Sequence, residues 1–279
     1  MGEEGALSNR NDPVDARRFA FGRNWARFLE VVNDVRISRA EKSLQDMLGT
    51  VSLGGLRFLD VGSGSGLFSL AARRLGAAVH SFDYDIDSVA TSKALRDRYL
   101  PGDSAWVIEQ GSVLDANYLR RLGRFDVVYA WGVLHHTGQM WSALENVLLP
   151  LRPGAQLFIA IYNDQGWKSR YWYRIKKLYG SGPLGRASVQ VVFLPYFSAR
   201  TAVKSLVTRR NEFANYKALR GMSVVHDWFD WLGGYPYEVA SVEAIVQFYA
   251  DRGLELLNLK RTKSLGNNEF VFRSRTEVP

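Results

Sequence analysis

Three glycines at alternate positions are the residues whose spacing most directly indicates chemistry. The apolar run that ends at Val61 breaks into Gly62, Gly64 and Gly66, and apolar residues resume afterwards with helical spacing. This order predicts a strand, a tight turn and a helix N-terminus, where the backbone can approach a nucleotide-like ligand closely. A second apolar run ends at Asp83, 19 residues beyond Gly64, where a carboxylate can accept hydrogen bonds from ribose hydroxyls. Together the two features predict a site for an adenosine moiety.

The spacing of the glycines distinguishes between adenosine cofactors. Dinucleotide-binding folds use G-x-G-x-x-G, whereas this chain has G-x-G-x-G. Residues 60–66 resemble the first motif of class I S-adenosylmethionine-dependent methyltransferases, and residues 82–85 resemble the acidic motif that ends their second strand. Residues 109–115 resemble the end of the third strand, which packs on adenine in that family, and residues 125–136 resemble the fourth strand and the loop beside the methyl donor. The resemblance implies S-adenosyl-L-methionine as the cofactor, and its nearest general match is the ubiquinone-pathway O-methyltransferases.

That resemblance also implies which residues bind the cofactor. Most lie at the carboxyl ends of the expected strands, and one lies in an N-terminal segment that could close over the cofactor as a lid. The set is Trp25, Asp60, Gly62, Ser63, Gly64, Gly66, Asp83, Tyr84, Gly111, Ser112, Val113 and Trp131.

Methyl transfer from a sulfonium is an in-line displacement, which requires the acceptor to be aligned about 3 Å from the methyl carbon with water kept away. An oxygen or ammonium acceptor must also lose a proton, and a nearby base would help, whereas a thioether needs none. The chain has 4 histidines, and His136 follows the fourth expected strand directly. We expect His136 to be this base, with a packing role as the alternative.

Three further residues are candidates for contact with the acceptor. Tyr162 and Asp164 follow the fifth expected strand, and His226 lies in the segment expected to cover the site. The residues Asn-Asp-Gln-Gly at 163–166 could equally form a simple turn. A histidine beside an aspartate, as at His226, is also compatible with a solvated surface position.

The remaining histidines and one turn are weaker candidates. His80 is expected in the core of the second strand. His135 follows the fourth strand, where the family that the chain resembles often has a histidine for packing or for cofactor contact. Tyr235 and Glu238 follow two glycines, so they could face the acceptor or belong to a turn.

Strand-like and helix-like runs alternate through most of the chain, which predicts an α/β fold with a parallel sheet between helices. The expected architecture is a Rossmann-like, doubly wound seven-stranded sheet with an inserted helical cap, in which the resemblance supplies the strand number and an antiparallel last strand. The expected strands are 56–61, 77–83, 105–110, 125–131, 155–162, 254–259 and 269–272, with a helix over 242–250. The expected units are an N-terminal tail and helical lid (1–55), a cofactor-binding core (56–163), an inserted acceptor cap (164–238) and a C-terminal completion of the core (239–279).

Composition narrows the possible functions. The chain has no cysteine, which excludes disulfides and thiolate chemistry and argues against a zinc site. Residues 164–220 hold 12 Lys or Arg against 2 acidic residues, although the whole chain carries only +8. No run approaches the ~18 apolar residues of a membrane span, and we expect a cytoplasmic protein.

We therefore expect methyl transfer to a small molecule, at oxygen, with no metal. The basic insertion leaves an RNA methyltransferase as an alternative, and a cofactor-binding scaffold without catalysis is a second. The mixed aromatic and basic helix at 167–177 could bind phosphates, lie on an anionic membrane or simply expose a solvated face. The sequence makes no prediction about the oligomeric state.

Overall fold

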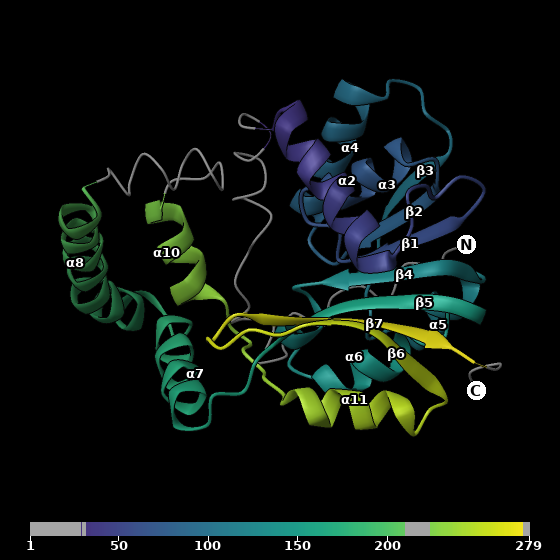
Figure 1. Cartoon of the computed structure of the whole chain (residues 1–279). Coiled ribbons are helices and arrows are strands. Elements are labelled where there is room, and N and C mark those ends of the chain that lie inside the picture. Colours follow the sequence, from purple (N-terminus) through teal and green to yellow (C-terminus); the bar gives the residue numbers. More distant parts are fainter. Residues whose placement is uncertain (1–28, 30–31, 210–223, 276–279) are drawn as a thin grey trace, which may run out of the picture.

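One mixed sheet organises the part of the chain that the computed structural model describes, which is residue 29, residues 32–209 and residues 224–275. The strands follow the order β3-β2-β1-β4-β5-β7-β6 (Figure 1). They are β1 (Arg57–Val61), β2 (Ala78–Asp83), β3 (Trp106–Gln110), β4 (Phe125–Trp131), β5 (Leu151–Tyr162), β6 (Leu254–Lys260) and β7 (Asn267–Ser274). β1 to β5 run parallel, and β7 lies antiparallel between β5 and β6. The predicted seven-stranded, doubly wound sheet with its antiparallel last strand is confirmed.

Helices cover both faces of this sheet (Figure 1). Phe58 packs with α2, α3 and α4 on one face, whereas its neighbour Leu59 packs with α5, α6 and α11 on the other. Strands that are buried on both faces read as continuous apolar runs, which explains why these strands were recognisable from the sequence. The helices are α2 (Asp34–Leu48), α3 (Leu67–Arg74), α4 (Ile86–Tyr99), α5 (Ala116–Arg121), α6 (Met140–Asn146) and α11 (Val242–Ala250).

One strand boundary differs from the sequence expectation. β5 begins at Leu151 rather than at 155, because Leu151 pairs with Phe125 before a register shift that accommodates Gly154 at φ +77°.

Helix α2 begins at Asp34 because the side chain of Asn33 accepts a hydrogen bond from the Arg36 amide and caps the helix. Trp25, expected in the N-terminal lid, lies outside the described residues.

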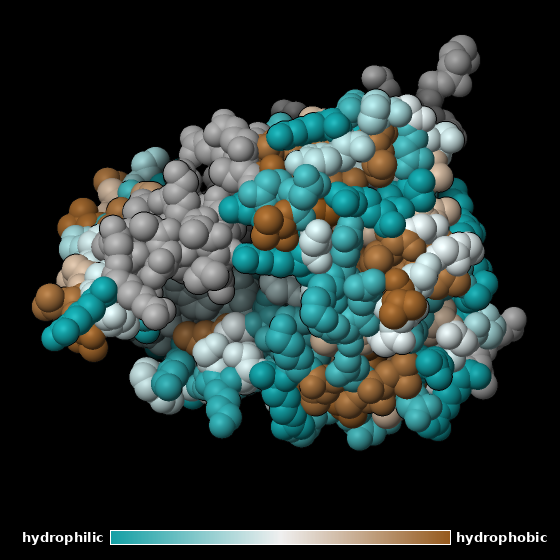
Figure 2. Space-filling view, turned by 45° about the horizontal axis from the view of Figure 1, so that its top comes forward, coloured by the Kyte–Doolittle hydropathy of each residue, from teal (hydrophilic) through white to brown (hydrophobic). Residues whose placement is uncertain are grey.

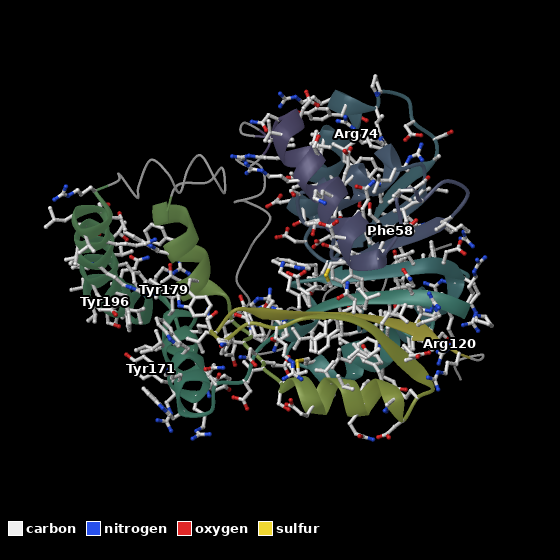
Figure 3. The ribbon with its side chains drawn as sticks, viewed as in Figure 1. Phe58, Arg74, Arg120, Tyr171, Tyr179 and Tyr196 are labelled. Carbon is white, nitrogen blue, oxygen red and sulfur yellow. The ribbon has the colours of Figure 1, made fainter. Side chains whose placement is uncertain are left out.

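The segment between β5 and α11 forms helices with a small core of their own. They are α7 (Trp167–Tyr179), α8 (Pro183–Thr208) and α10 (Val224–Gly233). Tyr179 of α7, Phe193 and Phe197 of α8 and Leu232 of α10 form a cluster separate from the two sheet cores. Figure 3 shows Tyr171, Tyr179 and Tyr196 on these helices, to one side of the sheet. The helical insertion expected from the sequence is therefore present.

Candidate functional site

The site begins where the strand order reverses, between β1 and β4. In open α/β sheets this switch point leaves a crevice at the carboxyl ends of the strands. Gly62 follows β1 with φ +70°, and a Cβ there would lie 2.5 Å from the side chain of Val133, which follows β4. Only glycine allows the loops after β1 and β4 to approach so closely.

Four amides of the glycine loop donate hydrogen bonds within the protein. The amides of Gly62 and Ser63 both donate to the Phe82 carbonyl, at 2.8 and 3.1 Å, and the Gly66 amide donates to the Ser63 carbonyl at 2.8 Å. The Gly64 amide donates to the carboxylate of Asp83 at 2.9 Å. These bonds hold the loop in the tight turn that lets its backbone approach a ligand closely.

Asp83 ties the glycine loop to the end of β2. Its second oxygen accepts a hydrogen bond from the Asp85 amide at 2.9 Å, and its backbone carbonyl accepts one from Gly111 at 3.0 Å. The Asp83 side chain is half-buried, and its contact with ribose hydroxyls remains a prediction. Tyr84, the next residue, is exposed at the same strand end.

Asp60 has a different setting from the other expected cofactor residues. Its side chain is only 2% exposed and accepts a 2.6 Å hydrogen bond from the Ser69 hydroxyl of α3. The pKa of Asp60 is raised to about 7, mainly because the carboxyl is buried; the hydrogen bond from Ser69 opposes this shift, and the nearby charge of Asp83 adds to it. In this arrangement Asp60 holds α3 against β1, and its contact with a cofactor remains a prediction.

The expected adenine side is tightly packed. A Cβ at Gly111 would lie 2.4 Å from the ring of Tyr118, whose hydroxyl donates to Glu109 at 2.6 Å. Val113 is buried in the sheet core, while the Ser112 hydroxyl oxygen accepts from the amide two residues later. At the end of β4, Trp131 is 41% exposed, so it remains accessible to a ligand.

The two adjacent histidines after β4 have different surroundings. Nδ1 of His136 lies 2.6 Å from the carbonyl oxygen of Pro236, which can only accept, so Nδ1 carries the proton. A neutral His136 therefore has its lone pair on Nε2. His135 is fully buried, and neither ring nitrogen has a hydrogen-bond partner among the described residues. Burial is the main reason that the pKa of His135 lies well below its ordinary value, and the nearby charge of His136 lowers it further.

Aromatic rings surround this histidine pair. The ring of Tyr162 lies 4.1 Å from His135 and 5.4 Å from His136, measured between centroids. On its other side Tyr162 meets Tyr237 at 5.1 Å and Trp231 at 6.1 Å. Rings from β5, from α10 and from the segment after α10 thus meet at the carboxyl end of the sheet.

Lys176 and Tyr237 were not among the residues predicted from the sequence. Lys176 is fully buried in α7, donates a hydrogen bond to the Trp231 carbonyl and lies 4.3 Å from the Trp231 ring centroid. The Trp231 carbonyl is near the C-terminal end of α10, where a cation interacts favourably with the helix dipole. Helical spacing on α7 could have identified Lys176, because it shares a buried face with Ser169 and Tyr179.

The chain after α10 is held against the histidine loop at three points. Pro236 accepts from His136, the Glu238 amide donates to the His135 carbonyl at 3.0 Å, and the Glu238 carboxylate accepts from the Met140 amide at 3.1 Å. Glu238 therefore caps α6, which has no other side-chain cap. Tyr235 in the same segment is buried.

Three sequence expectations have separate outcomes. Asp164 is exposed, and its carboxylate accepts from the Gly166 amide at 2.8 Å, so it forms the turn before α7. His226 belongs to α10, but its side chain lies outside the described residues. His80, expected in the core, is instead half-buried, and its Nε2 lies 3.1 Å from Glu109. In the register of β2 and β3, His80 is opposite Val107, so Glu109 is its diagonal neighbour on β3.

Known structures share this fold. The magnesium protoporphyrin IX methyltransferase of Synechocystis PCC 6803, solved with bound SAH, aligns with a TM-score of 0.55 and 13% identity, over 90% of this chain and 94% of that protein. At this identity the similarity shows the fold alone.

Curated relatives match at the level of sequence. The ubiquinone biosynthesis O-methyltransferase of Caulobacter sp. (strain K31) is 31% identical over 170 residues, which cover 54% of this chain and 64% of the relative. That of Parvibaculum lavamentivorans is 35% identical over 114 residues, or 39% of this chain and 41% of the relative. The chain thus spans less than two thirds of the length of both relatives. The family model for a methyltransferase domain matches residues 25–204, and by this match over more than half of its length the chain belongs to the methyltransferase domain family.

Proposed function

We propose that this chain transfers a methyl group from S-adenosyl-L-methionine to an oxygen atom of a small-molecule acceptor. The observation that carries the choice of oxygen is the hydrogen bond between His136 Nδ1 and the Pro236 carbonyl. It orients the ring and leaves Nε2 as the basic nitrogen, which an O–H acceptor needs and a thioether does not. The relatives named O-methyltransferases support the same choice.

The glycine loop and Asp83 fit the proposed cofactor. The loop lets the backbone approach a ligand closely, and the Asp83 carboxylate lies beside it at the end of β2, where we expect it to accept hydrogen bonds from ribose hydroxyls. When bound, S-adenosyl-L-methionine supplies an electrophilic methyl group on a sulfonium. Trp131, exposed at the end of β4, is the residue that we expect beside the cofactor.

The rest of the site serves the acceptor. His136 Nε2 takes the proton of the acceptor hydroxyl, and that proton later returns to solvent. The methyl carbon would exchange its bond to the sulfonium sulfur for a bond to the acceptor oxygen, and the demethylated cofactor would leave as a neutral thioether. The rings of Tyr162, Trp231 and Tyr237 suit a planar, apolar acceptor and keep water from the reacting oxygen. Because two of these rings belong to residues 164–238, we propose that this insertion is the acceptor cap.

Titration and turnover test the proposal together. Wild type should bind S-adenosyl-L-methionine and its demethylated product, and Asp83→Ala should weaken binding by about 1.5–3 kcal/mol, the range for a hydrogen bond to a charged group. A panel of phenols, amines, thioethers and transfer RNA should be screened for cofactor consumption. Consumption should occur with the phenols. His136→Ala should lower turnover about 10²- to 10⁴-fold at unchanged cofactor affinity.

His80→Ala serves as the matched control, since His80 pairs with Glu109 in the sheet rather than facing Tyr162. Its turnover should equal wild type. A loss below about threefold for His136→Ala would remove the base from the proposal. Consumption with transfer RNA alone would establish the RNA alternative, and binding without consumption by any acceptor would establish the scaffold.

A further inference from the structure

Helix α8 has two apolar faces, and the described residues cover only one of them. Val189, Phe193 and Phe197 are buried against α7 and α10. The outer face of α8 remains uncovered by any described residue. It consists of seven large apolar side chains that are between 56 and 88% exposed, namely Leu184, Val191, Val192, Tyr196, Val203, Leu206 and Val207.

The spacing of these side chains places them on one side of the helix. Val192, Tyr196, Val203 and Val207 are separated by four, seven and four residues, which is helical periodicity. Figure 1 shows α8 at the edge of the molecule remote from the sheet, and Figure 2 shows hydrophobic side chains beside hydrophilic ones at this end. Scattered apolar residues on a surface are ordinary, but a sustained stripe on a projecting helix marks an interaction surface.

The exposed charge of α7 and α8 has one sign. The sequence from 165 to 211 contains no aspartate or glutamate, while α7 and α8 contribute seven exposed basic residues in addition to the buried Lys176. The seven are Lys168, Arg170, Arg174, Lys177, Arg186, Arg200 and Lys204.

This combination discriminates between partners. A second copy of the chain would bring the same positive charge against itself, which opposes association. RNA would match the charge, but single-stranded nucleic acid is held on aromatic rings, and six of the seven residues of the outer face are aliphatic. Aliphatic side chains with basic neighbours suit the boundary between headgroups and acyl chains of an anionic bilayer.

We propose that the outer face of α8 docks on the surface of an anionic lipid bilayer. None of the described helices is long and apolar enough to cross a membrane, so α8 lies on the bilayer. The valine and leucine side chains enter the acyl boundary, and the basic side chains contact lipid phosphates. This inference is independent of the acceptor's identity and of methyl transfer.

Vesicle co-sedimentation tests the docking with the full chain. Wild type should sediment with phosphatidylglycerol vesicles at 0.1 M salt and should not sediment with phosphatidylcholine vesicles. Val203→Asp/Val207→Asp places two carboxylates on the outer face and should lower the bound fraction about tenfold or more, since it removes apolar anchors and repels anionic lipid. Arg200→Glu should weaken binding less and make the remainder less sensitive to salt.

Val51→Asp is the matched control, because Val51 is 85% exposed but lies in the loop before β1. It should bind vesicles like wild type. Circular dichroism and cofactor titration should show that all variants are folded, and a misfolded double variant would be replaced by the single substitution Val207→Asp. Sedimentation that is unchanged by the substitutions, equal on both lipids or absent for wild type would overturn the proposal.

Discussion

At the scale of single residues, neighbours decide what a side chain can do. His135 and His136 are adjacent in sequence, yet one is fully buried with a lowered pKa and the other is half-buried and oriented by Pro236. Both lie against the ring of Tyr162. The proposed role of His136 as a base depends on its tautomer, rather than on its presence alone.

A buried carboxyl at the same scale leads to a pH prediction. The pKa of Asp60 is raised by burial to about 7, so between pH 4 and 7 the folded protein holds a proton that the unfolded chain has lost. Stability should therefore fall as pH rises through this window, by up to about 1.4 kcal/mol per pH unit from this group. Asp60→Asn should remove that contribution, as measured by urea unfolding at pH 5, 6, 7 and 8.

Asp103→Asn provides a control of opposite sign. The Arg73 guanidinium lies 2.7 Å from the Asp103 carboxylate and lowers its pKa, so its contribution changes only in more acidic solution. From pH 5 to 8 its difference from wild type should be constant. An equally constant difference for Asp60→Asn would show that Asp60 is already ionised throughout this range.

At the scale of elements, the turn after β1 depends on backbone conformation and on space. Gly62→Ala would place a residue with a side chain at φ +70°, with its Cβ 2.5 Å from Val133. Gly102→Ala is matched in φ, at +74°, but has open space around it. Both should lose roughly 1–2 kcal/mol for the left-handed conformation, and Gly62→Ala should lose about 1–3 kcal/mol more for crowding.

Urea unfolding of both variants measures this difference. Adding Val133→Ala to Gly62→Ala should restore much of the extra loss, which a double-mutant cycle detects as coupling. Equal losses for the two alanine variants would mean that the loops after β1 and β4 are not in close contact.

At the scale of the whole molecule, the chain has separate packing units. The cluster formed by α7, α8 and α10 shares no residue with the two sheet cores. Phe193→Ala opens a cavity in that cluster, a change that costs about 3–5 kcal/mol for a well-buried phenylalanine. We expect faster hydrogen exchange in α8 and α10, unchanged exchange in β1 to β5, normal cofactor affinity and lower turnover.

Tyr196→Ala is the control on the same helix, since Tyr196 is 56% exposed. Its exchange pattern should match wild type. If Phe193→Ala also accelerated exchange in the sheet, the insertion and the sheet would unfold as one cooperative unit.

The sequence by itself determined the sheet, the glycine turn and the acidic strand end. Continuous apolar runs, glycines at positive φ and helix periodicity are short-range properties, and they appear in the structure close to where the sequence predicted them. The start of β5 was harder to predict from the sequence, because pairing between Leu151 and Phe125 extends the strand towards the N-terminus past a proline and a glycine.

Only the tertiary structure decided how the proposed acceptor side is assembled. The partner that orients His136 lies 100 residues farther along the chain, at Pro236, and Glu238 caps α6 from a similar separation. Lys176 appeared to be one of many basic residues until folding buried it against Trp231. A local sequence pattern reports the periodicity of one element. Contacts between elements depend instead on how the faces of distant segments pack together, and no local pattern in a single sequence reports that packing.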